Sequence, residues 1–188
     1  MEDIYTEILN YKPRNEQEEH DREVMLQWLK ETDDPWTRTN KTAHLTASAW
    51  ITDPTHQYVL MAYHNIYHSW AWLGGHADGD HDLLRVAEKE IQEESSLKNF
   101  HPLSSHICSL EVLTVDGHIK HGSYVSSHLH MNVTYLFEAE MDQDIHNKPD
   151  ENKAVGWFGL DEALEKCSEP WFRDHIYSKL NDLVRDLH

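Results

Sequence analysis

The chain is poor in basic side chains relative to acidic ones. Its 188 residues carry 16 Lys and Arg against 34 Asp and Glu, which gives a formal net charge of −18. No basic stripe is available to follow a phosphate backbone, and this argues against a nucleic acid polymer as a partner. A small anionic substrate fits such a chain only if a bound divalent cation supplies positive charge locally.

Cysteine and long apolar runs are also scarce. The two cysteines, Cys108 and Cys167, are too far apart in sequence to form a CxxC metal pair or a disulfide framework. No stretch approaches the roughly 18 apolar residues of a membrane span, and the N-terminus carries no apolar run. We therefore expect free thiols in a reducing cytosol, a cytoplasmic protein and no membrane partner.

The order of the apolar patterns predicts an α/β (α+β) protein. Residues 1–42 contain two amphipathic segments on either side of Pro13, which predict an N-terminal helical extension. Residues 43–188 form the expected single domain, with strands near 45–51, 58–63, 70–75, 108–115, 129–140 and 154–158 and helices near 83–97, 160–167 and 171–187. The sequence leaves open whether the N-terminal helices cover this domain or pair two chains into a homodimer.

Three glutamates lie on one face of the expected helix 83–97. Glu90, Glu93 and Glu94 are three or four residues apart, so their carboxylates project from the same side and repel one another. Most acidic helix faces are simply solvated. Here a glycine-bearing loop precedes the helix, whose opposite face is apolar, and a cation among the carboxylates explains the pattern better. Oxygen-only ligands favour Mg²⁺ or Mn²⁺ over zinc.

The loop and helix resemble the Nudix signature. In that signature a Gly is followed after five residues by Glu, and after seven more by Arg-Glu-apolar-x-Glu-Glu-x-Gly-apolar. The matching positions are Gly75, Glu90, Ile91, Glu93, Glu94 and Leu97. Three positions depart, because His81 replaces the first Glu, Lys89 replaces Arg and Ser96 replaces the late Gly. Lys89 keeps the charge but lacks the bidentate fork of arginine.

The resemblance implies a Nudix-like α/β/α sandwich around a mixed sheet. It also implies a hydrolase that cleaves a diphosphate linkage in a nucleoside diphosphate derivative or a nucleoside triphosphate, with Mg²⁺ or Mn²⁺ activating water. The implied metal ligands are Gly75 through its carbonyl, Glu90, Glu93 and Glu94.

The catalytic residues implied by the same resemblance are Glu93, Glu94 and one further acid. Such an acid is expected after the long central strand. Glu151, in the loop before the last strand, is preferred, and Glu138 on the strand itself remains the alternative.

Several side chains around the signature are candidate substrate contacts. His76 and His81 flank the expected metal loop, and His130 lies on the unusually polar face of the strand 129–140. Lys89 takes the place of the signature arginine. Trp72 is a candidate for stacking on a nucleobase, although aromatic residues at this spacing more often belong to the core.

The chain contains 16 histidines. The spacing of transition-metal ligands occurs in three pairs, His64 with His68, His118 with His121, and His128 with His130. For each pair taken alone, a structural or surface role is favoured.

Two other functions are compatible with this fold. A Nudix-like sensor that binds a nucleotide without cleaving it is motivated by the three departures from the signature. Isoprenoid-type diphosphate isomerases share the fold, but they resemble one another in having a catalytic cysteine just after the Trp-bearing strand. Residues 70–76 of this chain contain no cysteine.

Overall fold

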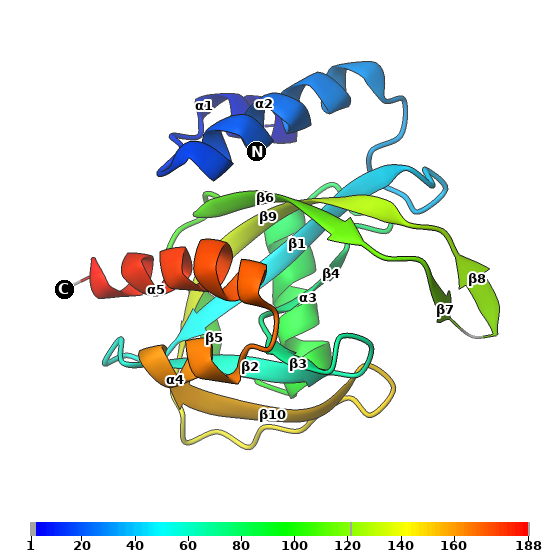
Figure 1. The fold of residues 1–188 in the computed structure, drawn as a ribbon. Helices are drawn as coiled ribbons and strands as arrows, with labels where there is room; N and C mark the ends of the chain where they lie inside the picture. The colour runs from blue at the N-terminus through cyan, green and yellow to red at the C-terminus, as the bar shows by residue number, and fades with distance from the viewer. Residues whose placement is uncertain (1–2, 121, 188) are drawn as a thin grey trace.

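A computed structural model describes residues 3–120 and 122–187 (Figure 1). The helices are α1 (Ile4–Asn10), α2 (Glu16–Glu31), α3 (Leu83–Ser95), α4 (Leu160–Lys166) and α5 (Ser178–Arg185), the last preceded by a π-helical segment, Phe172–Tyr177. The strands are β1 (Ala43–Thr52), β2 (Tyr58–His64), β3 (Ser69–Ala71), β4 (Leu73–His76), β5 (Phe100–Pro102), β6 (Ser109–Val115), β7 (His118–Lys120), β8 (Ser123–Val125), β9 (His128–Ala139) and β10 (Asn152–Gly159).

Strand β1 is the centre of a mixed sheet. It pairs in parallel with β9 along its whole length, and antiparallel with β4 in its middle and with β2 at its end. Strand β9 also pairs with β6 and β5, and β2 also pairs with β3 and β10. Two sheet arms therefore diverge from the shared pair β1 and β9 (Figure 1).

Helices cover both faces of this sheet. Helix α3 packs on one face, over the large apolar core, and α4 and α5 pack on the other, where Trp50 of β1 stacks on Tyr177 at a ring-centroid distance of 5.1 Å. The mixed α/β class and the sandwich predicted from the sequence are confirmed.

The two faces of β1 differ in chemistry. Its odd-numbered positions point into the core beneath α3, as the alternating pattern predicts. Its even-numbered positions are buried as well, and Thr46 and Ser48 both donate hydrogen bonds to the Oδ1 atom of Asn132, at 2.9 and 3.0 Å. Hydrogen bonding explains how a polar row is tolerated inside the sandwich.

Helices α1 and α2 cover the free edge of β6. Gln17 donates a side-chain hydrogen bond to the carbonyl of Leu110, and Asp21 accepts one from the N–H of Val112, at 3.2 and 3.0 Å. These contacts satisfy backbone groups that an edge strand leaves unpaired. Apolar residues of both helices also complete the core beneath the sheet. The N-terminal helices thus pack against their own chain.

The ends of α3 explain two features of the signature. Asp82 is the N-cap predicted from the sequence, because its side chain accepts the N–H of Arg85 at 3.1 Å. Ser96 is the C-cap and has φ of 60°, in the left-handed region that glycine adopts without strain. The signature glycine at this position therefore serves the helix end, and Ser96 fills the place at a conformational cost.

Some elements differ from the sequence-based expectations. The expected strand 70–75 is broken at Trp72 into β3 and β4, and β5 and the hairpin β7–β8 were not predicted. The expected last helix, 171–187, contains the π-helical segment before α5. None of the helices within the described ranges is both long and apolar enough to cross a membrane.

Candidate active site

Three carboxylates converge beside β4. Glu90 and Glu94 come from α3 and Glu151 from the turn before β10, and one oxygen of each lies within 4.8 Å of the other two. Glu94 is only 6% exposed, and its carboxylate accepts the N–H of Gly74 at 3.0 Å. We call these three residues the carboxylate cluster. They crowd three acidic groups into a small, partly buried volume.

Gly75 leaves the space that Glu90 occupies. A Cβ atom at this position would lie 2.3 Å from Oε1 of Glu90, closer than real contacts allow. At the neighbouring Gly74 a Cβ would instead meet the carbonyl oxygen of Ala47 in β1, at 2.7 Å. One glycine therefore makes room for a carboxylate, and the other for the pairing of β4 with β1.

Glu93 points to a different partner from its neighbours. Its carboxylate lies 3.0 Å from Nζ of Lys148 and 3.5 Å from Nζ of Lys89, and it is not part of the carboxylate cluster. Lys148 also lies 2.9 Å from Glu151, so one ammonium group bridges the two acids. Metal binding by Glu93 stays a prediction. Lys148 was not predicted, since only the folded loop brings it to α3.

The electrostatics of the cluster follow from burial and crowding. Burial, with repulsion from Glu151 and Glu93, raises the pKa of Glu90 to about 7. Burial and repulsion from Glu90 raise the pKa of Glu94 to about 8, against the lowering effect of the Gly74 N–H. The hydrogen bond from Lys148 lowers the pKa of Glu93. The two buried carboxyls thus hold protons near neutral pH, which a divalent cation would displace.

The loop that carries Glu151 is anchored to α3. Buried Asn152 donates to the backbone carbonyl of Glu94 at 3.0 Å and accepts the N–H of Lys148 at 3.2 Å. Glu138 lies elsewhere, 3.2 Å from His56 and 3.7 Å from His101. Of the two acids that the sequence left open, the structure places Glu151 next to the signature glutamates.

The five predicted substrate contacts lie in four different surroundings. His81 stacks on Trp36 with ring centroids 4.2 Å apart, and Lys89 pairs with Glu93. Trp72 packs edge-on against Phe172 and Tyr177 in the apolar cluster beneath the C-terminal helices.

The remaining two predicted contacts, His76 and His130, lie on the face of the sheet opposite to α3. Their ring centroids are 4.8 Å apart. Because successive residues of a strand point to opposite faces, His76 projects away from the side on which Gly75 meets Glu90. The structure therefore does not bring all five predicted contacts to the carboxylate cluster, and their roles stay predictions.

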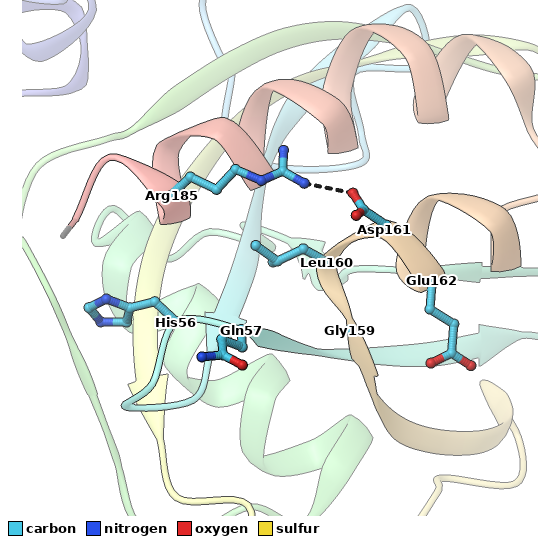
Figure 2. Close-up of a pocket in the computed structure, with 7 residues that line it drawn as sticks. All are labelled: His56, Gln57, Gly159, Leu160, Asp161, Glu162 and Arg185. Carbon is cyan, nitrogen blue, oxygen red and sulfur yellow. Dashed lines mark hydrogen bonds and ion pairs between the residues drawn. The ribbon is translucent and has the colours of Figure 1, made fainter.

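A surface pocket lies at the far end of β10. It is lined by His56, Gln57, Gly159, Leu160, Asp161, Glu162 and Arg185, and Figure 2 shows the 2.7 Å ion pair between Asp161 and Arg185 beside it. Gly159 ends β10, whereas Glu151 precedes its start. At about 3.3 Å per residue the strand separates them by roughly 25 Å. The pocket is thus no part of the carboxylate cluster.

The donor set of the cluster suits a hard divalent cation. Carboxylate oxygens from two elements and a glycine that leaves space at Glu90 match the ligands preferred by Mg²⁺ and Mn²⁺. Gly75 is the position from which the resemblance implies a carbonyl ligand. The residues present therefore fit the metal that the resemblance implies.

Comparisons with known proteins match this fold. The chain is 13% identical to the dihydroneopterin triphosphate pyrophosphohydrolase of E. coli, with a TM-score of 0.56 over 76% of this chain and 95% of that one. It is 18% identical to an Ap4A hydrolase of C. elegans, with a TM-score of 0.51 over 77% of this chain and 98% of that one. At these identities the likeness shows the fold.

A sequence relative and a family model extend the match. The chain is 24% identical to the asymmetrical bis(5'-nucleosyl)-tetraphosphatase of Rattus norvegicus over 116 residues, which are 61% of this chain and 72% of that protein. The model of the NUDIX domain matches residues 42–180, which contain all three acids of the carboxylate cluster. The hydrolase class predicted from the sequence is confirmed, and the chain belongs to the Nudix family.

Proposed function

We propose that this chain is a pyrophosphohydrolase that requires Mg²⁺ or Mn²⁺ and cleaves a diphosphate linkage in a nucleoside diphosphate derivative or a nucleoside triphosphate. The observation that carries this proposal is the convergence of Glu90, Glu94 and Glu151 at the signature glycine. The rat and C. elegans relatives are named for dinucleoside tetraphosphates, and the E. coli structure for a pterin triphosphate. These names support polyphosphate anhydrides as the substrate class.

Glu90, Glu94 and Glu151 would hold the metal, together with the carbonyl of Gly75. When bound, the divalent cation supplies charge neutralisation on phosphoryl oxygens and lowers the pKa of an attacking water. The chain's own contribution is positioning, because the Gly74 N–H fixes the Glu94 carboxylate. The backbone contact of Asn152 fixes the loop of Glu151.

Glu151 is also our candidate general base. It lies at the edge of the cluster on a loop, where its carboxylate can accept a proton from water next to a bound phosphate. Lys148, which bridges Glu151 and Glu93, would turn to an anionic phosphate oxygen of the substrate. Glu93 would thereby be released to act as the further ligand that the signature implies.

Two side chains of the signature segment are candidates for binding the substrate. His81 and Lys89 lie on the loop and helix that carry the signature and are the candidates for phosphate contacts. Trp72 packs in the apolar cluster beneath the C-terminal helices, and His76 and His130 lie on the face of the sheet opposite to α3, so we do not place these three side chains against the diphosphate.

The decisive experiment is a hydrolysis screen with Mg²⁺ and Mn²⁺ over nucleoside triphosphates, nucleotide sugars, dinucleoside polyphosphates and ADP-ribose in oxygen-labelled water. Turnover with label in one product identifies both the substrate and the attacked phosphorus. Tight nucleotide binding with no cleavage under any metal would instead support the sensor.

Two variants then assign the base. Glu151→Gln is expected to lower kcat more than it raises KM, whereas Glu138→Gln, whose carboxylate faces His56 and His101, is expected to stay near wild type. A slow Glu138→Gln protein beside a normal Glu151→Gln protein would move the role to the strand residue.

A further inference from the structure

Four histidines from three strands meet on the face of the sheet opposite to α3. They are His44 of β1, His76 of β4, and His128 and His130 of β9, and one ring nitrogen of each lies within 4.8 Å of the other three. The ring centroid of His44 lies 5.0–5.1 Å from the centroids of the other three rings. We call this set the four-histidine cluster.

Strand register explains why these side chains converge. His44 is directly opposite His130 in the parallel pair of β1 with β9, and His76 is opposite Thr46, two residues further along β1. Residues two apart on a strand share a face, so all four rings project to one side. The arrangement follows from the sheet itself and does not rely on a flexible loop.

The hydrogen bonds of two rings fix their tautomers. Nδ1 of His44 lies 3.3 Å from the carbonyl of Asn40, and Nδ1 of His128 lies 2.8 Å from the carbonyl of Ser126. A carbonyl only accepts, so each Nδ1 carries the hydrogen, and each neutral ring presents a lone pair on Nε2. Metal-binding histidines are oriented in this way, with the second ring nitrogen donating to a backbone carbonyl.

The second ring nitrogen of His44 is buried without a hydrogen-bond donor among the described residues. Nε2 of His44 has no hydrogen-bond partner within the described part of the chain, although this residue is only 4% exposed. A buried acceptor without a donor is unfavourable. Nε2 of His128 lies 3.3 Å from Nε2 of His130. With metal–nitrogen bonds of about 2.0–2.1 Å, tetrahedral geometry places two nitrogen ligands roughly 3.3–3.4 Å apart.

We propose that the four-histidine cluster is a second metal site, for a zinc-type divalent ion, distinct from the carboxylate cluster across β4. An all-imidazole donor set favours zinc and its transition-metal neighbours, whereas the carboxylate cluster favours Mg²⁺ or Mn²⁺. The proposal does not depend on the proposed hydrolase activity, because metal binding by itself tests it.

The first test uses the full chain without a histidine tag, stripped with a chelator and titrated with Zn²⁺ alone. We expect one tight equivalent that survives in the Glu90→Gln/Glu94→Gln protein. In the His128→Asn/His130→Asn protein we expect a loss of affinity on the order of a hundredfold or more. The matched control removes two exposed histidines, His20 and His106, which are 70% and 75% exposed. Equal affinity in the two histidine double variants would overturn the proposal.

A second measurement does not depend on a variant that folds. X-ray absorption at the zinc edge of the wild-type protein loaded with one equivalent should show imidazole nitrogens at about 2.0–2.1 Å, and the Co²⁺ form should show the intense visible bands of tetrahedral coordination. A first shell of oxygen only, or the weak spectrum of octahedral Co²⁺, would place the ion elsewhere and exclude this site.

Discussion

Strand β4 has a group of potential metal ligands on each side, and the two groups differ in every chemical respect. The carboxylate cluster consists of acidic side chains from a helix and a loop, and Lys148 bridges two acids at its edge. The four-histidine cluster consists of imidazole rings from three strands, and backbone carbonyls orient two of these rings. Because Gly75 and His76 are adjacent but face opposite ways, one short strand serves both.

The difference shows how the chemistry of the donor atoms and their surroundings determine whether a bound ion exchanges or stays bound. The crowded carboxylates repel one another and retain protons. Cation binding is therefore coupled to deprotonation, and the affinity for the cation increases with pH. Neutral imidazoles repel little and are oriented in advance, so they suit an ion that stays bound. These properties match the two proposals, in which the carboxylates take an exchangeable, substrate-linked cation and the histidines take a resident ion.

The largest effect should come from Glu94→Gln. The variant keeps the acceptor for the Gly74 N–H but removes a buried charge, so we expect kcat to fall by about a hundredfold or more with the fold intact. Glu93→Gln should lose less, on the order of tenfold, because Glu93 reaches the cluster only after Lys148 moves. Steady-state kinetics and circular dichroism check both. Full activity in the Glu94→Gln protein would show that the carboxylate cluster is not required for hydrolysis.

The second comparison uses the two glycines. Gly75→Ala pushes the flexible end of Glu90 aside, so we expect Mg²⁺ affinity to fall by about tenfold with little change in melting temperature. Gly74→Ala collides with the backbone of β1, so we expect unfolding free energy to drop by about 1–3 kcal/mol. Calorimetry with Mg²⁺ and thermal unfolding distinguish the two. The reverse assignment of effects would contradict the geometry.

These clusters also show what could be predicted from sequence. Glu90 and Glu94 were predictable because helical spacing places them on one face, and Gly75 was predictable from the resemblance to the Nudix signature. His128 and His130 were noticed as a pair from their spacing as well. His121 of another noticed pair lies outside the described residues, and His64 and His68 are not part of a metal-ligand group among those described.

The remaining site residues depend on long-range pairing. His44 and His76 are 32 residues apart. The antiparallel pairing of β4 with β1 brings these two together, and the parallel register of β1 with β9 brings His130 to them. Lys148 and Asn152 contact α3 through the conformation of one loop, which no periodicity encodes. Sequence patterns specify which face a side chain occupies, but not which strands become neighbours.

The third prediction compares the pH dependence of the two clusters in metal-free protein. Glu90 and Glu94 have pKa values raised from 4.5 to about 7 and 8, so their contribution to stability declines as pH rises from about 4.5 to 8. His44 and His130 have lowered pKa values, so their contribution is complete above about 6.5 and is lost as pH falls.

Between pH 6.5 and 8.5 only the carboxyl contribution changes, so thermal unfolding in chelator should show falling stability with rising pH. Saturating Mg²⁺ should reverse this trend, because its ligands must be deprotonated. The matched Glu90→Gln/Glu94→Gln protein should give a flat profile. A profile in that variant as steep as the wild type would place the titrating groups elsewhere.

The fourth prediction concerns the cation at the edge of the carboxylate cluster. Lys148→Met removes a positive charge that competes with metal for Glu93 and Glu151, so we expect Mg²⁺ to bind about fivefold more tightly. Zn²⁺ binding to the four-histidine cluster should not change. Lys153→Met removes the same charge from an exposed position on β10 and is the control. Equal Mg²⁺ affinities in the two variants would show that Lys148 does not compete with metal at this site.

The smallest effect is expected at the end of α3. Ser96 has φ of 60°, a conformation that costs a serine more than a glycine, so Ser96→Gly should raise the free energy of unfolding by up to about 1 kcal/mol. The departure from the signature at this position would then affect the free energy of unfolding and would not affect either cluster. Urea unfolding at constant m-value gives the stability change. Lower stability of the Ser96→Gly protein would show that contacts of the Ser96 hydroxyl outweigh the backbone strain. A changed Mg²⁺ affinity would show that the conformation of the helix end affects the position of Glu94.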